Sequence, residues 1–216
     1  MKSRLLYIYD ALCGWCYGFS PVIRRFEAEH RDQFTFDVLS GGMMTGPRVQ
    51  PISVSMSYIE SAYKTVEERT GVRFGQAYLD NILKPGTYLS DSSKPGQAMT
   101  LFKAIQAGND EPRLIEFAAA LQNALYRDGI DLNVPSHYAS IVEPFGVDPD
   151  EFVAHLDDEA IQRQTQQEFA LVSQMQIGGF PSVIVEHNNA YFLVARGYLP
   201  YEALTANVQR ALAQTA

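Results

Sequence analysis

The hydrophobic and polar positions of the first 40 residues predict a strand, a helix and a second strand. Residues 4–9 are apolar and aromatic without a breaker, which is typical of a buried strand. From Cys16 to His30 apolar residues recur three and four positions apart, as on one face of a helix, and Pro21 predicts a kink in it. Residues 33–39 alternate and predict a second strand. Together these elements predict a right-handed βαβ unit.

The last part of the chain changes period and predicts a hairpin followed by a helix. Residues 182–186 form one predicted strand, and residues 191–194 form the returning strand. Between them lies His187-Asn188-Asn189, a turn whose asparagines tolerate a positive φ. Leucine and valine at four-residue spacing predict a final helix over residues 200–214.

The middle of the chain is predominantly helical. Residues 40–57 are interrupted by glycine and proline and are predicted to form a loop. We interpret the pair Met43-Met44 in this loop as packing filler, with the lining of a binding groove as the less favoured alternative. Helical periodicity then continues from residue 56 to about residue 164, and a long helix is predicted over residues 158–175.

The two cysteines of the chain, Cys13 and Cys16, lie where the first predicted strand gives way to the first helix. The leading N–H groups of a helix lack intrahelical partners and carry partial positive charge, which stabilises a thiolate at Cys13. Gly14 and Trp15 are expected to leave Cys13 near solvent while Cys16 faces inward. The pattern predicts a redox-active pair in which Cys13 attacks and Cys16 resolves.

Other uses of the cysteine pair fit less well. Zinc normally takes four ligands, and the four histidines are scattered without a His–x₃₋₅–His pair, so no metal site is predicted. A structural disulfide across three residues would constrain the unfolded chain little. A Cys–His hydrolase needs a histidine beside Cys13, and spacing alone nominates none.

Composition limits the partners and the compartment. The net charge is −8 and basic residues form no run, which argues against nucleic acid. No stretch of about 18 apolar residues is present, so no membrane association is predicted. The apolar run before Cys13 is too short for the core of a signal peptide, and we therefore expect a cytoplasmic protein.

A second motif, Gly178-Gly179-Phe180-Pro181-Ser182, directly precedes the strand of the hairpin. Proline at a strand entry is commonly a plain turn residue, and only about 5–6% of X–Pro bonds are cis. Paired with the strand–CxxC–helix unit, however, this loop resembles that of the thioredoxin superfamily. The chain more specifically resembles the DsbA family and its cytoplasmic FrnE-like branch. The resemblance is carried by Cys13-Gly14-Trp15-Cys16, the Pro181 loop and the helical segment 117–132.

The resemblance implies an α/β thioredoxin-like fold, in which βαβ and ββα units build a central mixed sheet with a large inserted α-helical domain. Residues 1–42 and 165–216 would form the thioredoxin-like domain, and residues 43–164 the inserted domain. Pro181 is then expected to be cis. Phe180 and Pro181, with Gly14 and Trp15, are the expected substrate-binding neighbours of the redox site.

The implied activity is that of a thiol–disulfide oxidoreductase or isomerase acting on a disulfide- or thiol-bearing protein or small molecule. No cofactor is expected, with glutathione as a candidate redox partner. The first alternative is a glutathione-dependent isomerase or transferase of the kappa or 2-hydroxychromene-2-carboxylate isomerase type, although those proteins typically carry serine where Cys13 stands. The second alternative is a non-enzymatic binding module. The sequence leaves the substrate, the direction of electron flow and the oligomeric state open.

Overall fold

Four strands form the central sheet of the protein, whose structure is a computed structural model that describes residues 2–214. The strands are β1 (Ser3–Tyr9), β2 (Phe34–Ser40), β5 (Ser182–His187) and β6 (Ala190–Arg196), in the order β2-β1-β5-β6. β1 runs parallel to β2 and antiparallel to β5, and β5 pairs with β6 as a hairpin. The four predicted strands are confirmed.

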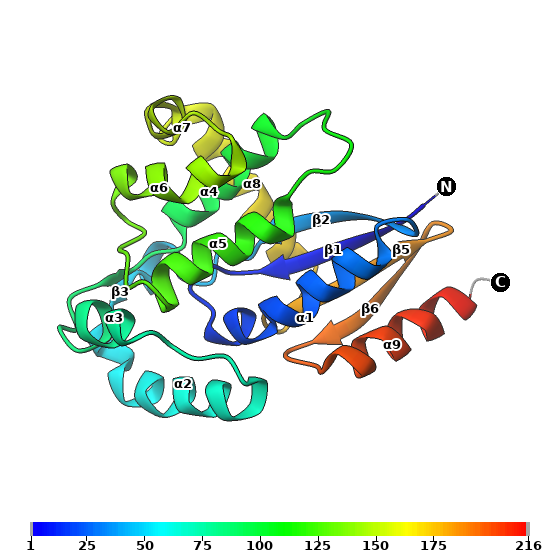
Figure 1. Ribbon diagram of the computed structural model, residues 1–216, viewed down its shortest axis with the longest axis horizontal. Coiled ribbons are helices and arrows are strands. Elements are labelled where there is room, and N and C mark those ends of the chain that lie inside the picture. Colours follow the sequence, from blue (N-terminus) through cyan, green and yellow to red (C-terminus); the bar gives the residue numbers. More distant parts are fainter. Residues whose placement is uncertain (1, 215–216) are drawn as a thin grey trace.

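Helices cover both faces of this sheet. Figure 1 shows α1 (Gly14–His30) and α9 (Tyr201–Ala213) in front of the sheet and α8 (Glu159–Gln174) behind it. The sheet with α1 and α9 gives the βαβ and ββα units of a thioredoxin-like fold, as predicted. Pro21 lies inside α1, as the sequence indicated.

The side chains of β1 pack into two hydrophobic cores, because successive residues of a strand point to opposite faces of the sheet. Leu5 and Tyr7 belong to the main hydrophobic core, on the face that α1 covers. Leu6 and Ile8 belong to a smaller core that includes Val172 of α8. β1 is therefore buried on both sides, which explains its uninterrupted apolar sequence.

The segment between β2 and β5 is mostly helical, as predicted. Its helices are α2 (Met56–Thr70), α3 (Gln76–Tyr78), α4 (Ser93–Ile105), α5 (Leu114–Tyr126), α6 (Tyr138–Val142), α7 (Pro149–His155) and α8, joined by short 3₁₀ and π-helical turns. The prediction of a loop over residues 40–57 is wrong in part. Two residues of that stretch, β3 (Gln50–Pro51), pair antiparallel with β4 (Leu89–Ser90). Such short strands carry no periodic signal.

The helical segment shares its core with the sheet. Phe102 of α4 stacks on Phe117 of α5 with ring centroids 4.0 Å apart, and both belong to the cluster that contains Tyr7 of β1. Lys103 of α4 donates to the carbonyl of Val38 in β2 at 2.8 Å. The domain boundaries placed after residues 42 and 164 stay a prediction, and the second one falls within α8.

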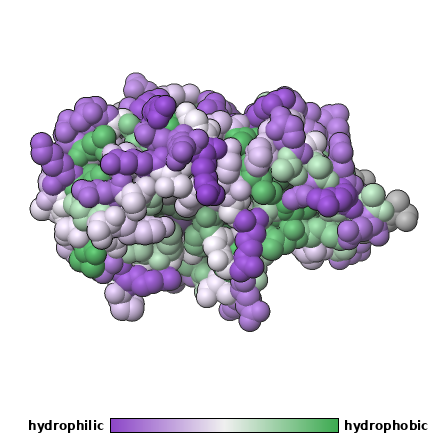
Figure 2. Space-filling view, turned by 90° about the horizontal axis from the view of Figure 1, so that it is seen from below, coloured by the Kyte–Doolittle hydropathy of each residue, from purple (hydrophilic) through white to green (hydrophobic). Residues whose placement is uncertain are grey.

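One face of the molecule carries hydrophobic residues among hydrophilic ones. Figure 2 views the molecule from below and shows hydrophobic residues gathered among the hydrophilic ones toward the half that carries the sheet. Tyr191 and Leu193, on strand β6 at the edge of the sheet, are exposed. No helix within residues 2–214 is long and apolar enough to span a membrane.

Candidate active site

Cys13 is the N-cap residue of α1, and its sulfur takes the position that a capping oxygen usually holds. The backbone of Cys13 is extended, and its Sγ accepts a hydrogen bond from the N–H of Cys16 at 3.3 Å. Its own N–H donates to the carbonyl of Asp10 at 3.1 Å, which fixes the turn between β1 and α1. The sulfur thus faces the N–H groups of the first helical turn and the positive end of the helix dipole.

Both thiols are free, and Cys13 is more enclosed than the sequence suggested. Cys16 is fully buried, as expected, but Cys13 is only 6% exposed, so the prediction that it lies near solvent is wrong. The inserted helical segment reaches over this turn: a Cβ at Gly14 would lie 3.6 Å from the Phe74 ring. Burial, and then the neighbouring Cys13, raise the pKa of Cys16, which keeps it protonated in the resting protein.

The loop before β5 lies directly beside Cys13. The Phe180–Pro181 peptide bond is cis, as the resemblance implied. The thiol of Cys13 donates to the carbonyl of Phe180 at 3.6 Å. A Cβ at Gly41 would lie 2.2 Å from the Phe180 ring, so glycine at this position is what lets the ring pack against the chain leaving β2. The structure thus brings together Cys13 and Phe180, which are 167 positions apart.

Trp15 extends the site on its other side. Its ring lies 6.4 Å from that of Tyr198, in the loop between β6 and α9. Trp15 and Gly14 also line an apolar cavity beside the dithiol. All of the predicted redox-site neighbours, Gly14, Trp15, Phe180 and Pro181, therefore lie within this one region of the fold.

Asp10 is a buried anchor of the site to which sequence reasoning assigned no role. It is 2% exposed and accepts hydrogen bonds from the N–H of Leu12 at 2.9 Å and of Met43 at 2.8 Å, and from the hydroxyl of Ser92 at 3.0 Å. Burial raises the pKa of this carboxyl, although the three donors act in the opposite direction. One side chain thus ties the dithiol turn to the chain after β2 and to the start of α4.

Tyr7 lies behind the dithiol. Its ring is 1% exposed, and its hydroxyl has no hydrogen-bond partner among the nitrogen and oxygen atoms of residues 2–214. Burial, followed by the thiols of Cys16 and Cys13, raises the pKa of Tyr7 well above its usual value. Tyr7 therefore stays a neutral phenol next to Cys16. The apolar pattern of β1 gave no sign of this contact.

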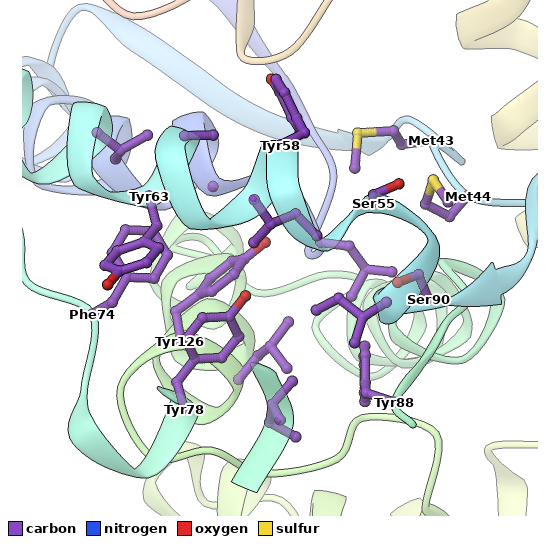
Figure 3. A pocket seen from close by; sticks show the side chains of 18 of the residues that line it. Met43, Met44, Ser55, Tyr58, Tyr63, Phe74, Tyr78, Tyr88, Ser90 and Tyr126 are labelled. Atoms are coloured by element: carbon purple, nitrogen blue, oxygen red, sulfur yellow. The ribbon is translucent and has the colours of Figure 1, made fainter. Parts of the chain in front are cut away.

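A cavity of about 190 Å³ opens beside the dithiol, between α2 and the residues around Tyr78, Tyr88 and Tyr126. Met43 and Met44 line it, as the less favoured interpretation of these methionines implied, and Met43 also packs against the main core. In Figure 3 the rings of Tyr78 and Tyr126 point their hydroxyls toward the centre of the cavity, and Tyr63 and Phe74 close one end.

Residues 2–214 contain no group of three or more histidine, cysteine, aspartate or glutamate side chains placed to hold a metal ion. The two thiols at the start of α1 are the nucleophilic groups of the site. A dithiol at the start of the helix after the first strand, on this mixed sheet, defines a thioredoxin-fold protein.

Comparison with known proteins identifies the family. The model of the DSBA-like thioredoxin domain matches residues 5–209, and the chain belongs to this family. A candidate protein disulfide isomerase from Nitrosomonas europaea has a similar structure, with a TM-score of 0.86 and 26% identity over 100% of both chains. No curated protein matches the sequence.

Two further solved structures share the fold. The cytosolic disulfide reductase DsbM from Pseudomonas aeruginosa has a TM-score of 0.79 at 23% identity, over 98% of this chain and 99% of its own. DsbM has also been solved with GSH. A 2-hydroxychromene-2-carboxylate isomerase has a TM-score of 0.62 at 13% identity, over 98% of this chain and 95% of its own.

Proposed function

We propose that the protein catalyses thiol–disulfide exchange through Cys13 and Cys16. The observation that carries this proposal is the position of the Cys13 sulfur at the N-cap of α1, 3.3 Å from the N–H of Cys16 and beside the Phe180 carbonyl. A thiolate held there is an activated nucleophile. The proposal rests on this geometry together with membership of the DSBA-like family.

The exchange proceeds in two balanced steps. The Cys13 thiolate attacks one sulfur of a substrate R–S–S–R′, a Cys13–S–R mixed disulfide forms, and R′S⁻ leaves. Cys16 then loses its proton and attacks Cys13, which forms the Cys13–Cys16 disulfide and releases RS⁻. The substrate is reduced by two electrons and the protein is oxidised by two, and the reverse sequence oxidises a dithiol.

The two cysteines have different roles because their surroundings differ. Cys13 is slightly exposed and its sulfur lies at the N-terminus of α1, whereas Cys16 is fully buried and its pKa is raised. Cys16 therefore remains a thiol until the mixed disulfide forms, when the sulfur of Cys13 becomes the electrophile that Cys16 attacks. We assign substrate contact to Gly14, Trp15, Phe180 and Pro181, with the Phe180 backbone placed to pair with an extended substrate segment.

The redox partner and the compartment form part of the same proposal. DsbM is described as a cytosolic disulfide reductase and has been solved with GSH. By this likeness we place the protein in the cytoplasm and assign glutathione the role of a thiol that exchanges with the Cys13–Cys16 disulfide. We also assign the protein to the FrnE-like branch of the family, because the Cys13-Gly14-Trp15-Cys16 motif resembles that branch.

Substitution of the resolving cysteine tests the proposal. With Cys16→Ser, catalytic reduction of insulin with glutathione as reductant should collapse, while a stable mixed disulfide accumulates at Cys13 and is visible by intact mass. Cys13→Ser should abolish both. If wild-type protein neither reduces insulin nor refolds scrambled ribonuclease, the proposed activity is wrong and the binding-module alternative is favoured.

The glutathione-dependent isomerase remains the second candidate because of the apolar cavity beside Cys13 and the shared fold of the 2-hydroxychromene-2-carboxylate isomerase. Such a reaction needs one activated sulfur and no resolving thiol. Isomerase activity that survives Cys16→Ser would therefore support this candidate over disulfide exchange.

A further inference from the structure

The cavity beside the dithiol contains no charge. It is lined by aromatic, aliphatic and methionine side chains, with a few amides and hydroxyls. Among the described residues that line it there is no lysine, arginine, histidine, aspartate or glutamate. An unpaired carboxylate or ammonium group is costly to bury in such surroundings. The cavity therefore selects against ligands that carry charge into it.

The position of the cavity connects it to the chemistry at Cys13. Leu12, Gly14 and Trp15 line it, so the residues on both sides of Cys13 form part of its wall. The cavity thus begins at the dithiol turn and extends away from it under α2. A group attached to the sulfur that reacts with Cys13 has this space beside it.

One residue of the cavity wall carries an unsatisfied polar group. Tyr88 is 6% exposed, lines the cavity, and its hydroxyl has no hydrogen-bond partner among residues 2–214. Buried hydroxyls are normally paired, and an unpaired one marks a place where a ligand or water completes the bonding. The hydroxyls of Tyr78 and Tyr126 point into the same space (Figure 3).

The volume limits the size of the occupant. A cavity of about 190 Å³ is slightly larger than the apolar cavities of about 150 Å³ that bind benzene. It has room for one substituted aromatic ring or a branched alkyl group of similar size. A glutathionyl group, with two carboxylates and an ammonium group, matches neither the size nor the chemistry.

We propose that the cavity is the substrate-selecting site of the protein. It binds one uncharged aromatic or branched apolar group that carries one hydrogen-bonding substituent. This group is attached to one sulfur of a small disulfide. This inference rests on the proposed disulfide exchange at Cys13. It adds that the substrate is an apolar small-molecule disulfide and that glutathione does not occupy this cavity.

The rate test compares three disulfides that share one hydroxyethyl half. The other half is benzyl, hydroxyethyl or glutathionyl, and each compound reacts in a single turnover with pre-reduced protein, so that no further reductant enters. Burying one ring should raise the second-order rate constant for the benzyl compound by on the order of 10- to 100-fold over the hydroxyethyl compound. The glutathionyl compound should react no faster than the hydroxyethyl compound.

Two variants test the cavity itself. Ala62→Phe adds a ring to the wall of the cavity and should reduce the benzyl-to-hydroxyethyl rate ratio to near one. Ser61→Phe is the matched control, because the neighbouring Ser61 is exposed on α2 and lies outside the lining, and it should leave the ratio unchanged. Replacing benzyl by 4-hydroxybenzyl should raise affinity about 2- to 10-fold, and Tyr88→Phe should remove that gain alone.

Binding can be measured without reaction because Trp15 is the only tryptophan of the chain and lines the cavity. The Cys13→Ser variant should show a Trp15 fluorescence change with the benzyl compound at a concentration at least 10-fold lower than with the glutathionyl compound. Equal rates for all three disulfides, or a preference for the glutathionyl one, would overturn the proposed selectivity and leave disulfide exchange intact. Binding of the benzyl compound without any turnover would overturn disulfide exchange and retain the cavity as a binding site.

Discussion

Asp10 is the side chain whose removal should disturb the site most without touching either thiol. It accepts from two backbone N–H groups, those of Leu12 and Met43, and from the hydroxyl of Ser92, at distances of 2.8–3.0 Å. These partners belong to the dithiol turn, to the chain after β2 and to the start of α4. Asp10→Ala therefore detaches three segments from one another.

The magnitude follows from the two backbone N–H groups, because Ser92 can rotate its hydroxyl whereas a peptide N–H cannot turn away. Each buried donor left without a partner costs about 1–3 kcal/mol, which gives about 2–6 kcal/mol for the pair. The variant also avoids the burial of a carboxyl group, whose raised pKa shows that burial is unfavourable to its charged form. The expected net loss in free energy of unfolding is therefore about 2–4 kcal/mol.

Urea unfolding followed by circular dichroism at pH 7 measures this loss. Asp148→Ala is a matched control, because Asp148 also accepts from two backbone N–H groups, those of Asp150 and Glu151, but is exposed. Water replaces that helix cap, so the control should cost only about 1 kcal/mol. If Asp10→Ala costs no more than Asp148→Ala, the reasoning from buried donors is refuted.

The pH dependence of stability gives a second test of the role of Asp10. In the unfolded chain the Asp10 carboxyl ionises near its ordinary pKa of about 3.9, whereas burial raises the folded-state pKa above that value. Between the two values only the unfolded state has released the proton, so the contribution of Asp10 to stability is lost as pH rises through this window. The free energy of unfolding of wild type should therefore fall relative to that of Asp10→Asn from about pH 4 upward, and the difference should then level off. A difference that shifts in favour of wild type as pH rises would contradict the raised pKa.

Three further substitutions test other contacts of the site and the core. Gly41→Ala places a Cβ 2.2 Å from the Phe180 ring and should cost about 1–3 kcal/mol in urea unfolding and slow insulin reduction, because the ring and the carbonyl beside Cys13 are displaced together. Tyr7→Phe removes a buried hydroxyl without a nitrogen or oxygen partner and should leave the free energy of unfolding unchanged or raise it by up to about 1 kcal/mol, so a loss above 1 kcal/mol would show that the hydroxyl is bonded. Lys103→Met leaves the largely buried carboxylate of Glu168 without its cation and should cost about 2 kcal/mol, with little change on adding salt.

The sequence predicted the parts of the fold that depend on local patterns. The hairpin is an example: Asn188 and Asn189 have φ values of +50° and +62°, the conformation that their short polar side chains tolerate. Helix α1 and the central strands were equally visible, because each has a long apolar face with its own period. The position of Cys13 at the start of α1 followed from those boundaries alone.

The parts that the sequence did not show depend on contacts between distant segments. The pairing of β3 with β4 joins residues about 40 positions apart through two-residue strands that have no pattern of their own. Phe74, which lies beside Gly14, and Phe180, which lies beside Cys13, come from the helical segment and from the far end of the chain. The role of Asp10 also required the positions of Met43 and Ser92, so no local signal in its own strand identified it.

The enclosure of Cys13 also determines how a disulfide reaches it. A small disulfide needs only the space beside the dithiol turn, whereas a disulfide within a folded protein brings surrounding backbone that must occupy the volume now held by the insertion. Among the residues of α2, all of which are described, only Val66 is buried, so few fully buried side chains hold this helix in place.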